Sequence, residues 1–162
     1  MKKLKIYLDT SIVSHLDAPE RADWQDDTHR LWSAIQAEEY EVFLSPVVMA
    51  EIDGCTEPKL SRLLNYLQKI QYTELKKTGE VTELAKKYLE AGILGKKSFD
   101  DCQHIAYACV YNCDMLVSWN FKHLVNIKTI SGVKGVNALA GYREMPIYTP
   151  TILISGGADD DS

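Results

Sequence analysis

The sequence predicts an α/β fold in which helices cover both faces of a mostly parallel sheet. Short apolar segments of strand length alternate with longer segments whose apolar residues recur every three or four positions. Such alternation is typical of βαβ units, which build parallel sheets. The chain of 162 residues fits one domain with its own core, and we expect residues 1–154 to form that domain.

Five elements are expected in the first third of the chain. In order they are a strand at 3–8, a short helix, a helix at 27–39, a strand at 41–44 and a helix at 46–52. Thr10 and Ser11 could cap the short helix that follows the first strand. The last of these has the clearest start, because Ser45 is a good N-cap residue and Pro46 suits the first helical position. This helix carries Glu51.

The remaining segments continue the alternation. We expect helices at 58–70, 80–91, 99–112 (capped by Ser98) and 132–140, strands at 72–75 and 114–118, and an extended segment at 146–154. Residues 155–162 are rich in Gly and Asp, and we expect a disordered acidic tail there.

Composition excludes some classes of protein and leaves others open. No run of 18 apolar residues exists, so we expect no membrane span, and the N-terminus lacks the apolar length of a signal peptide, which favours the cytoplasm. The four cysteines match no zinc-binding spacing, and we expect them to be buried as small hydrophobic residues. The net charge of −5 neither supports nor excludes an RNA substrate, because the aspartates at 159–161 carry three of those charges.

Four polar residues are expected at one edge of the sheet. Asp9 ends the first strand, and Asn120 follows a later strand by two residues. Glu51 lies in the helix after the second strand, and Asp101 lies in the first turn of another helix. Carboxylate and amide oxygens suit a hard cation such as Mg²⁺ or Mn²⁺, which can activate water and neutralise charge on a phosphodiester.

Four segments of the chain resemble the four motifs of PIN-domain nucleases, and they resemble most closely those of VapC-type toxins. They are residues 6–11, 48–52, 101–108 and 116–121 (IYLDTS, VMAEI, DCQHIAYA and LVSWNF), in the expected order within residues 3–148. The resemblance implies a three-layer α/β/α sandwich and a metal-dependent ribonuclease that cuts single-stranded or structured RNA. It also implies that Asp9, Glu51 and Asp101 are the acidic catalytic and metal-binding residues.

The fourth motif departs from the family, which usually has Asp where this chain has Asn120. An amide oxygen can still bind a cation or hold a water molecule, but it brings no charge, so a second metal ion would bind more weakly. Asp100 and Asp101 would both stabilise a helix N-terminus. Only the family's Asp-x-x-His-Ile-Ala pattern selects Asp101, leaving Asp100 as a supporting residue or an exposed cap.

Further residues are expected to support the site or touch the substrate. The supporting residues are Thr10, Ser11, Asp100, His104 and Ser118, and the candidate substrate-binding residues are Lys122 and His123. Lys96, Lys97 and Lys128 could contact phosphates, although surface lysines are usually only solvated. Trp119 and Phe121 could stack on RNA bases, but core packing is the simpler expectation for both.

Two functions remain open from the sequence. The first is the toxin of a type II toxin–antitoxin pair, a ribonuclease with a cognate antitoxin as its partner and a homodimer as its possible assembly. The second, motivated by Asn120, is a catalytically weak or silent module that binds RNA or a protein. A phosphatase with Asp9 as nucleophile is set aside, because Ser11 stands where its second Asp belongs.

Overall fold

The computed structural model describes residues 2–155, and within them a five-stranded parallel sheet has the order β3-β2-β1-β4-β5. The strands are β1 (Leu4–Leu8), β2 (Tyr40–Leu44), β3 (Thr73–Glu74), β4 (Met115–Val117) and β5 (Ile147–Tyr148). Ile6 of β1 is aligned with Val42 of β2 on one side and Met115 of β4 on the other. The central strand β1 is thus enclosed, and its last three residues are 0% exposed.

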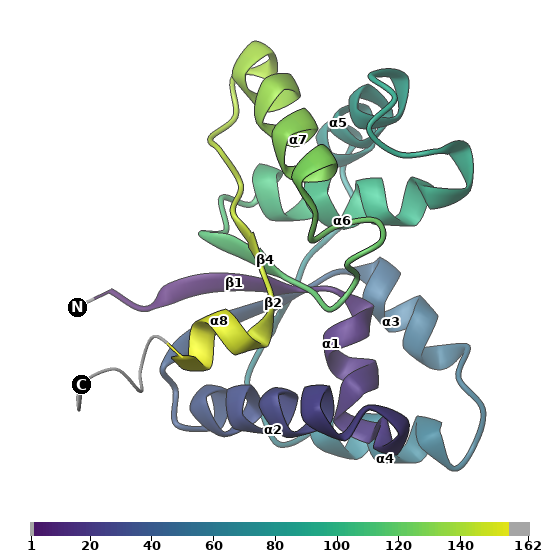
Figure 1. The fold of residues 1–162 in the computed structure, drawn as a ribbon, viewed down its shortest axis with the longest axis vertical. Coiled ribbons are helices and arrows are strands. Elements are labelled where there is room, and N and C mark those ends of the chain that lie inside the picture. Colours follow the sequence, from purple (N-terminus) through teal and green to yellow (C-terminus); the bar gives the residue numbers. More distant parts are fainter. Residues whose placement is uncertain (1, 156–162) are drawn as a thin grey trace.

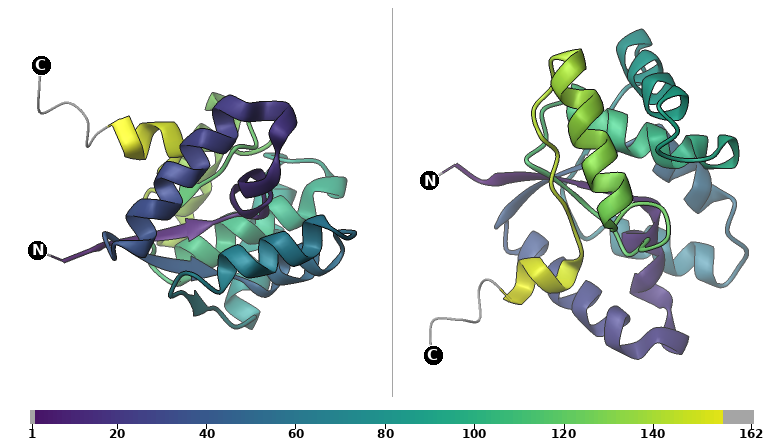
Figure 2. Two further views of the ribbon diagram at one scale, coloured as in Figure 1. Left: turned by 90° about the horizontal axis from the view of Figure 1, so that it is seen from below. Right: turned by 45° about the horizontal axis from the view of Figure 1, so that its top comes forward.

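Two layers of helices enclose the sheet, as Figures 1 and 2 show. One layer contains α1 (Thr10–Ser14), α2 (Ala22–Gln36), α4 (Lys59–Leu67) and α8 (Pro150–Ser155). The other contains α5 (Gly79–Glu90), α6 (Phe99–Val110) and α7 (Ile127–Ala140). α3 (Pro46–Asp53) contacts α1 and α4 as well as α6, so it bridges the layers. Three short 3-10 helices are η1 (His15–Asp17), η2 (Pro19–Arg21) and η3 (Lys96–Ser98). The expected α/β/α sandwich is confirmed.

The strand order places a natural crevice beside β1. The chain adds β2 and β3 on one side of β1 and then β4 and β5 on the other, so the order reverses between β1 and β4. In open α/β sheets, ligands bind beyond the carboxyl ends of the strands at such a reversal. Asp9 follows β1 directly, and its backbone N–H donates to Val117 O of β4 at 3.2 Å.

The structure corrects two expected helix caps and one expected helix start. Asp9 itself is the N-cap of α1, because its carboxylate accepts from Ile12 N at 3.3 Å. Ser98 makes no side-chain cap, and its hydroxyl contacts His123 Nδ1 at 3.1 Å instead. α7 begins at Ile127 rather than at 132, because Asn126 caps it by accepting from Thr129 N.

The C-terminal segment also differs from its expected extended form. Only Ile147–Tyr148 pairs with the sheet, and Pro150 then starts α8, which includes Ser155. Ser155, where the disordered tail was expected to begin, is the last residue of α8, and residues 156–162 of that expected tail lie outside the described residues. Three cysteines are buried as expected, but Cys55 is only half-buried. No helix among residues 2–155 is both long and apolar enough to cross a membrane.

Candidate functional site

A pocket of about 280 Å³ lies where β1 and β4 end, and we call it the acidic pocket. Its lining includes all four residues expected at the site. The full lining is Asp9, Thr10, Ser11, Ser14, His15, Glu51, Asp101, His104 and Asn120. The residues come from the ends of two strands and from α1, η1, α3 and α6, so only the tertiary fold assembles them.

Asp9 is buried at the base of the acidic pocket and is only 3% exposed. Its Oδ1 accepts from the Ser11 hydroxyl at 2.6 Å, and its Oδ2 accepts from the Ser118 hydroxyl at 2.6 Å. Burial raises the pKa of Asp9, although nearby His104 and these hydroxyls act in the opposite direction. A buried carboxylate of this kind gains from a positively charged partner.

Glu51 is held by two donors on the side wall. Its Oε1 accepts from the Thr10 hydroxyl at 2.8 Å and lies 3.2 Å from His104 Nε2. The hydrogen bond with His104 is the largest influence on Glu51 and lowers its pKa. Burial alone would lower the pKa of His104, but Glu51, Asp9 and Asp101 outweigh it, so that pKa is raised.

His104 is oriented in turn by a buried pair of hydroxyls. Its Nδ1 lies 2.6 Å from the Tyr7 hydroxyl, which donates to Ser45 Oγ at 2.7 Å. An imidazolium fits this arrangement, because both of its ring nitrogens donate, one to Tyr7 and one to Glu51. Burial raises the pKa of Tyr7 well above 10.0, which keeps the phenol protonated.

Asp101 and Asn120 are joined through His123. Asp101 Oδ2 lies 2.9 Å from His123 Nδ1, and Asn120 Oδ1 accepts from the His123 backbone N–H at 2.9 Å. His123 was expected to bind substrate, and in the structure its ring contacts Asp101 and Ser98. The loop after β4 thereby supports the acid on α6.

The donor chemistry of the acidic pocket fits a hard divalent cation, because Asp9, Glu51, Asp101 and Asn120 all offer oxygen. In the conformation described, each carboxylate points to an internal partner. Within residues 2–155, no three His, Cys, Asp or Glu side chains are placed so as to hold a metal ion together. Glu51 and Asp101 each use one carboxylate oxygen for these partners, so binding a cation here would require the side chains to move closer together.

Two expected residues lie apart from the acidic pocket. Asp100 lines a different pocket of about 260 Å³ with Lys77 and Gln103, and only Glu51 is common to the two. Lys122 is exposed on the loop after β4 and does not line the acidic pocket. Ser118 lies outside the lining but holds Asp9 from behind, as a supporting residue should.

Sequence reasoning missed His15 and the hydroxyls behind His104. His15 lines the acidic pocket from η1, and its Nδ1 lies 2.7 Å from Ser11 O. No pattern in the sequence marks His15. Tyr7 lies in an apolar strand, where an aromatic residue is expected for packing alone, so only its partners reveal a polar role.

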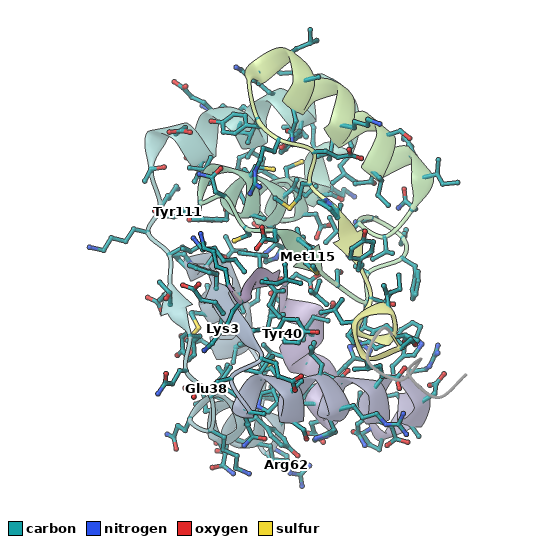
Figure 3. The ribbon with its side chains drawn as sticks, turned by 90° about the vertical axis from the view of Figure 1, so that its left-hand side faces the viewer. Lys3, Glu38, Tyr40, Arg62, Tyr111 and Met115 are labelled. Carbon is teal, nitrogen blue, oxygen red and sulfur yellow. The ribbon has the colours of Figure 1, made fainter. Side chains whose placement is uncertain are left out.

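A hollow larger than the acidic pocket lies at the opposite end of the sheet. It measures about 420 Å³, and its lining includes Lys3, Glu38 and Tyr40, which are labelled in Figure 3. Lysines and glutamates are mixed along its wall, which also includes Glu41 and Lys69. This hollow lies away from the carboxyl ends of the strands, so we place the functional site at the smaller acidic pocket.

Comparison of the sequence with protein-family models and with curated proteins gives no match. Comparison of the structure gives clear matches among solved structures. One is a chain of VapBC2 from Rickettsia felis, which was solved bound to a DNA fragment from its promoter. The two chains are 14% identical, with a TM-score of 0.56. The match covers 90% of this chain and 98% of that one.

A second match is VapC20 from Mycobacterium tuberculosis, described as a sarcin–ricin loop cleaving toxin. It is 17% identical, with a TM-score of 0.56, over 86% of this chain and 98% of that one. In both cases nearly the whole neighbouring chain is matched. The chain thus has the VapC fold, which confirms the PIN-like architecture that the four motifs implied.

Proposed function

We propose that the chain is a metal-dependent endoribonuclease that acts as the toxin of a toxin–antitoxin pair. The observation that carries the proposal is the acidic pocket, in which three carboxylates and one amide line a single hollow at the sheet reversal. The likeness to a sarcin–ricin loop cleaving toxin supports RNA as the substrate. A fold does not by itself determine an activity. The residues of the acidic pocket must therefore also suit the cleavage of RNA.

Asp9, Glu51 and Asp101 would hold Mg²⁺ or Mn²⁺, and Asn120 would add a neutral oxygen. When bound, such an ion lowers the pKa of a water molecule and offsets charge on the phosphate. The chain's own residues set the positions of these ligands. Ser11 and Ser118 orient Asp9 through hydrogen bonds of 2.6 Å each, and His123 orients Asp101.

His104 has a separate role in this proposal. His104 is only 2% exposed, and its ring is held between Tyr7 and Glu51. A protonated His104 would keep Glu51 ionised and add one positive charge to the lining of the acidic pocket. That charge would assist the approach of an anionic phosphodiester toward a cluster of carboxylates.

The proposed partner is an antitoxin protein. The R. felis neighbour is a VapBC complex solved on promoter DNA, and we extend such a pairing to this chain as part of the proposal. A homodimer also stays a prediction. Neither partner changes the assignment of the acidic pocket.

A second candidate is a catalytically silent module that binds RNA or protein. Two observations favour it: Asn120 has no charge, and the carboxylates of Glu51 and Asp101 are turned toward His104 and His123. This candidate predicts that RNA or a protein partner is bound without cleavage.

Cleavage assays separate the two candidates. The full chain, purified without a partner, is incubated with a panel of single-stranded and hairpin RNAs in Mg²⁺, Mn²⁺ or EDTA. We expect cleavage in either metal, none in EDTA, and a loss of at least about 100-fold in Asp9→Asn, because the central ligand loses its charge.

Asp100→Asn is the matched control. It removes the same charge one residue from Asp101 but outside the acidic pocket, and we expect nearly unchanged cleavage. Failure to cut any RNA in either metal would favour the silent module. Equal cleavage by Asp9→Asn and the parent chain would refute the site.

A further inference from the structure

An aromatic cluster of Trp24, Trp119 and Phe121 lies beside the acidic pocket. The rings of Trp24 and Trp119 are stacked, with centroids 4.9 Å apart and planes inclined by 6°. The Phe121 ring is tilted against both, 5.4 Å from Trp24 and 6.5 Å from Trp119. The cluster joins the start of α2 to the loop after β4.

The three rings differ in exposure, and this decides which of them can meet a ligand. Trp119 is 3% exposed, and its Nε1–H donates to Thr28 Oγ1 at 2.8 Å, so it is a core residue as expected. Phe121 was also expected in the core, but it is 45% exposed. The exposure of Trp24 is intermediate between those of Trp119 and Phe121. Phe121 therefore presents a large apolar ring to solvent, and Trp119 anchors the aromatic cluster in the core.

A positive charge lies on the same cluster. The guanidinium carbon of Arg21 lies 3.5 Å from the centroid of the Trp24 ring. Arg21 also pairs with Asp23 at 3.1 Å, and both side chains are exposed, so the pair is weak. An exposed guanidinium plane over an aromatic face is a surface on which nucleobases stack.

The aromatic cluster is continuous with the acidic pocket on two sides. Phe121 follows Asn120, which lines the pocket. His15 also lines the pocket, and its ring lies 5.4 Å from that of Trp24 and 6.2 Å from that of Trp119. A phosphodiester in the pocket would therefore place an adjoining base within reach of Phe121.

We propose that Phe121, supported by Trp24 and Arg21, is a stacking platform for an unpaired nucleobase of single-stranded RNA next to the phosphate in the acidic pocket. The proposal rests on the proposed ribonuclease function and adds the residues that would bind a base of its substrate. A base inside a duplex has both faces covered by the neighbouring base pairs, so it has no free face to stack on Phe121. The aromatic cluster thus selects single strands, or bases extruded from loops, by stacking rather than by sequence.

Binding to a defined strand tests the platform apart from catalysis. The probe is a short fluorescent RNA of mixed sequence, titrated with the full chain in Ca²⁺, with strand integrity checked on a gel. The comparison probe is an abasic strand of the same length, which keeps the phosphates and lacks the bases. We expect Phe121→Ala to raise the Kd for the RNA about 5- to 100-fold, because one base–aromatic stack is lost.

Three further variants make the test specific. Phe121→Trp keeps an aromatic face and should restore binding, whereas Phe121→Leu keeps apolar area only and should not. Leu139→Ala is the control, since Leu139 is 93% exposed on α7 and belongs to neither the acidic pocket nor the aromatic cluster. Binding of the abasic strand should be the same in all four variants.

Three results would overturn the platform. The first is an RNA affinity that Phe121→Ala leaves unchanged, and the second is no RNA binding by the parent chain, which would leave this face for a protein partner. The third is an equal loss of affinity for the RNA and the abasic strand. If stacking behaves as expected but no RNA is ever cleaved in Mg²⁺ or Mn²⁺, the ribonuclease function fails and the base-binding surface stands.

Discussion

Replacing Tyr7 by phenylalanine removes one oxygen atom from the interior behind the acidic pocket. That oxygen lies 2.7 Å from Ser45 Oγ and 2.6 Å from His104 Nδ1, and all three residues are buried. Within residues 2–155, no buried side-chain nitrogen or oxygen lacks a hydrogen-bond partner. The variant would create such an atom at His104 Nδ1, while Ser45 keeps its contact with Val48 N at 3.4 Å.

The expected cost follows from these contacts. A buried polar atom left without a partner costs about 1–3 kcal/mol, and the lost hydrogen bond is part of the same change. We therefore expect Tyr7→Phe to lower the free energy of unfolding by about 2–3 kcal/mol. For a chain of this size, that corresponds to a fall in Tm of about 4–12 °C.

Urea unfolding in EDTA, followed by tryptophan fluorescence and circular dichroism, measures this loss. Tyr111→Phe is the matched control, because the Tyr111 hydroxyl donates to Lys76 O at 2.7 Å near the surface, where water can replace it. We expect a loss below about 1 kcal/mol there. Equal losses in the two variants would refute the argument that the hydroxyl behind His104 is a buried polar link.

Three other predictions concern packing, pH and metal binding. Gly132→Ala should destabilise the fold by about 1–3 kcal/mol, because its new Cβ would lie 2.7 Å from a buried isoleucine. Gly135→Ala, with open space around it, should stabilise by up to about 1 kcal/mol; urea midpoints of both variants check the signs. The pKa of Glu51 is lowered from 4.5 and that of His104 is raised from 6.5. Their pair therefore stabilises the fold fully between these values, and less as pH falls through the lowered pKa or rises through the raised one. In EDTA the difference in urea midpoint between the parent chain and Glu51→Gln should shrink as pH rises from about 6 to about 9, and a constant difference would contradict this. Asn120→Asp should tighten Mg²⁺ binding measured by calorimetry, since it adds a charge; an unchanged affinity would mean that this residue is no ligand.

Local patterns predicted most of the elements. Ser45 and Pro46 predicted the start of α3 correctly, because an N-cap hydroxyl and a proline act within a few residues. α7 begins five residues before the predicted start at 132, because the side chain of Asn126 caps the helix there. The helix α8 was missed because its six residues pack against α2, a long-range contact that no local pattern records.

The sequence by itself determined the parallel α/β class, the position of Asp9 at the end of a strand, and the four oxygen donors expected at one edge. The fold class and the position of Asp9 follow from periodicity and from strand ends, which are properties of short segments. The choice of Asp101 over Asp100 followed only from the resemblance to the PIN-domain motifs. Only the tertiary structure decided how the acids are held: Asp9 between two serines, Glu51 on His104, and Asp101 on His123. These contacts join residues 22 to 109 positions apart, with the Ser11–Asp9 bond as the one local exception. The exposure of Phe121 was likewise decided by packing between α2 and the loop after β4, because an aromatic residue in a sequence does not reveal which of its faces the fold will cover.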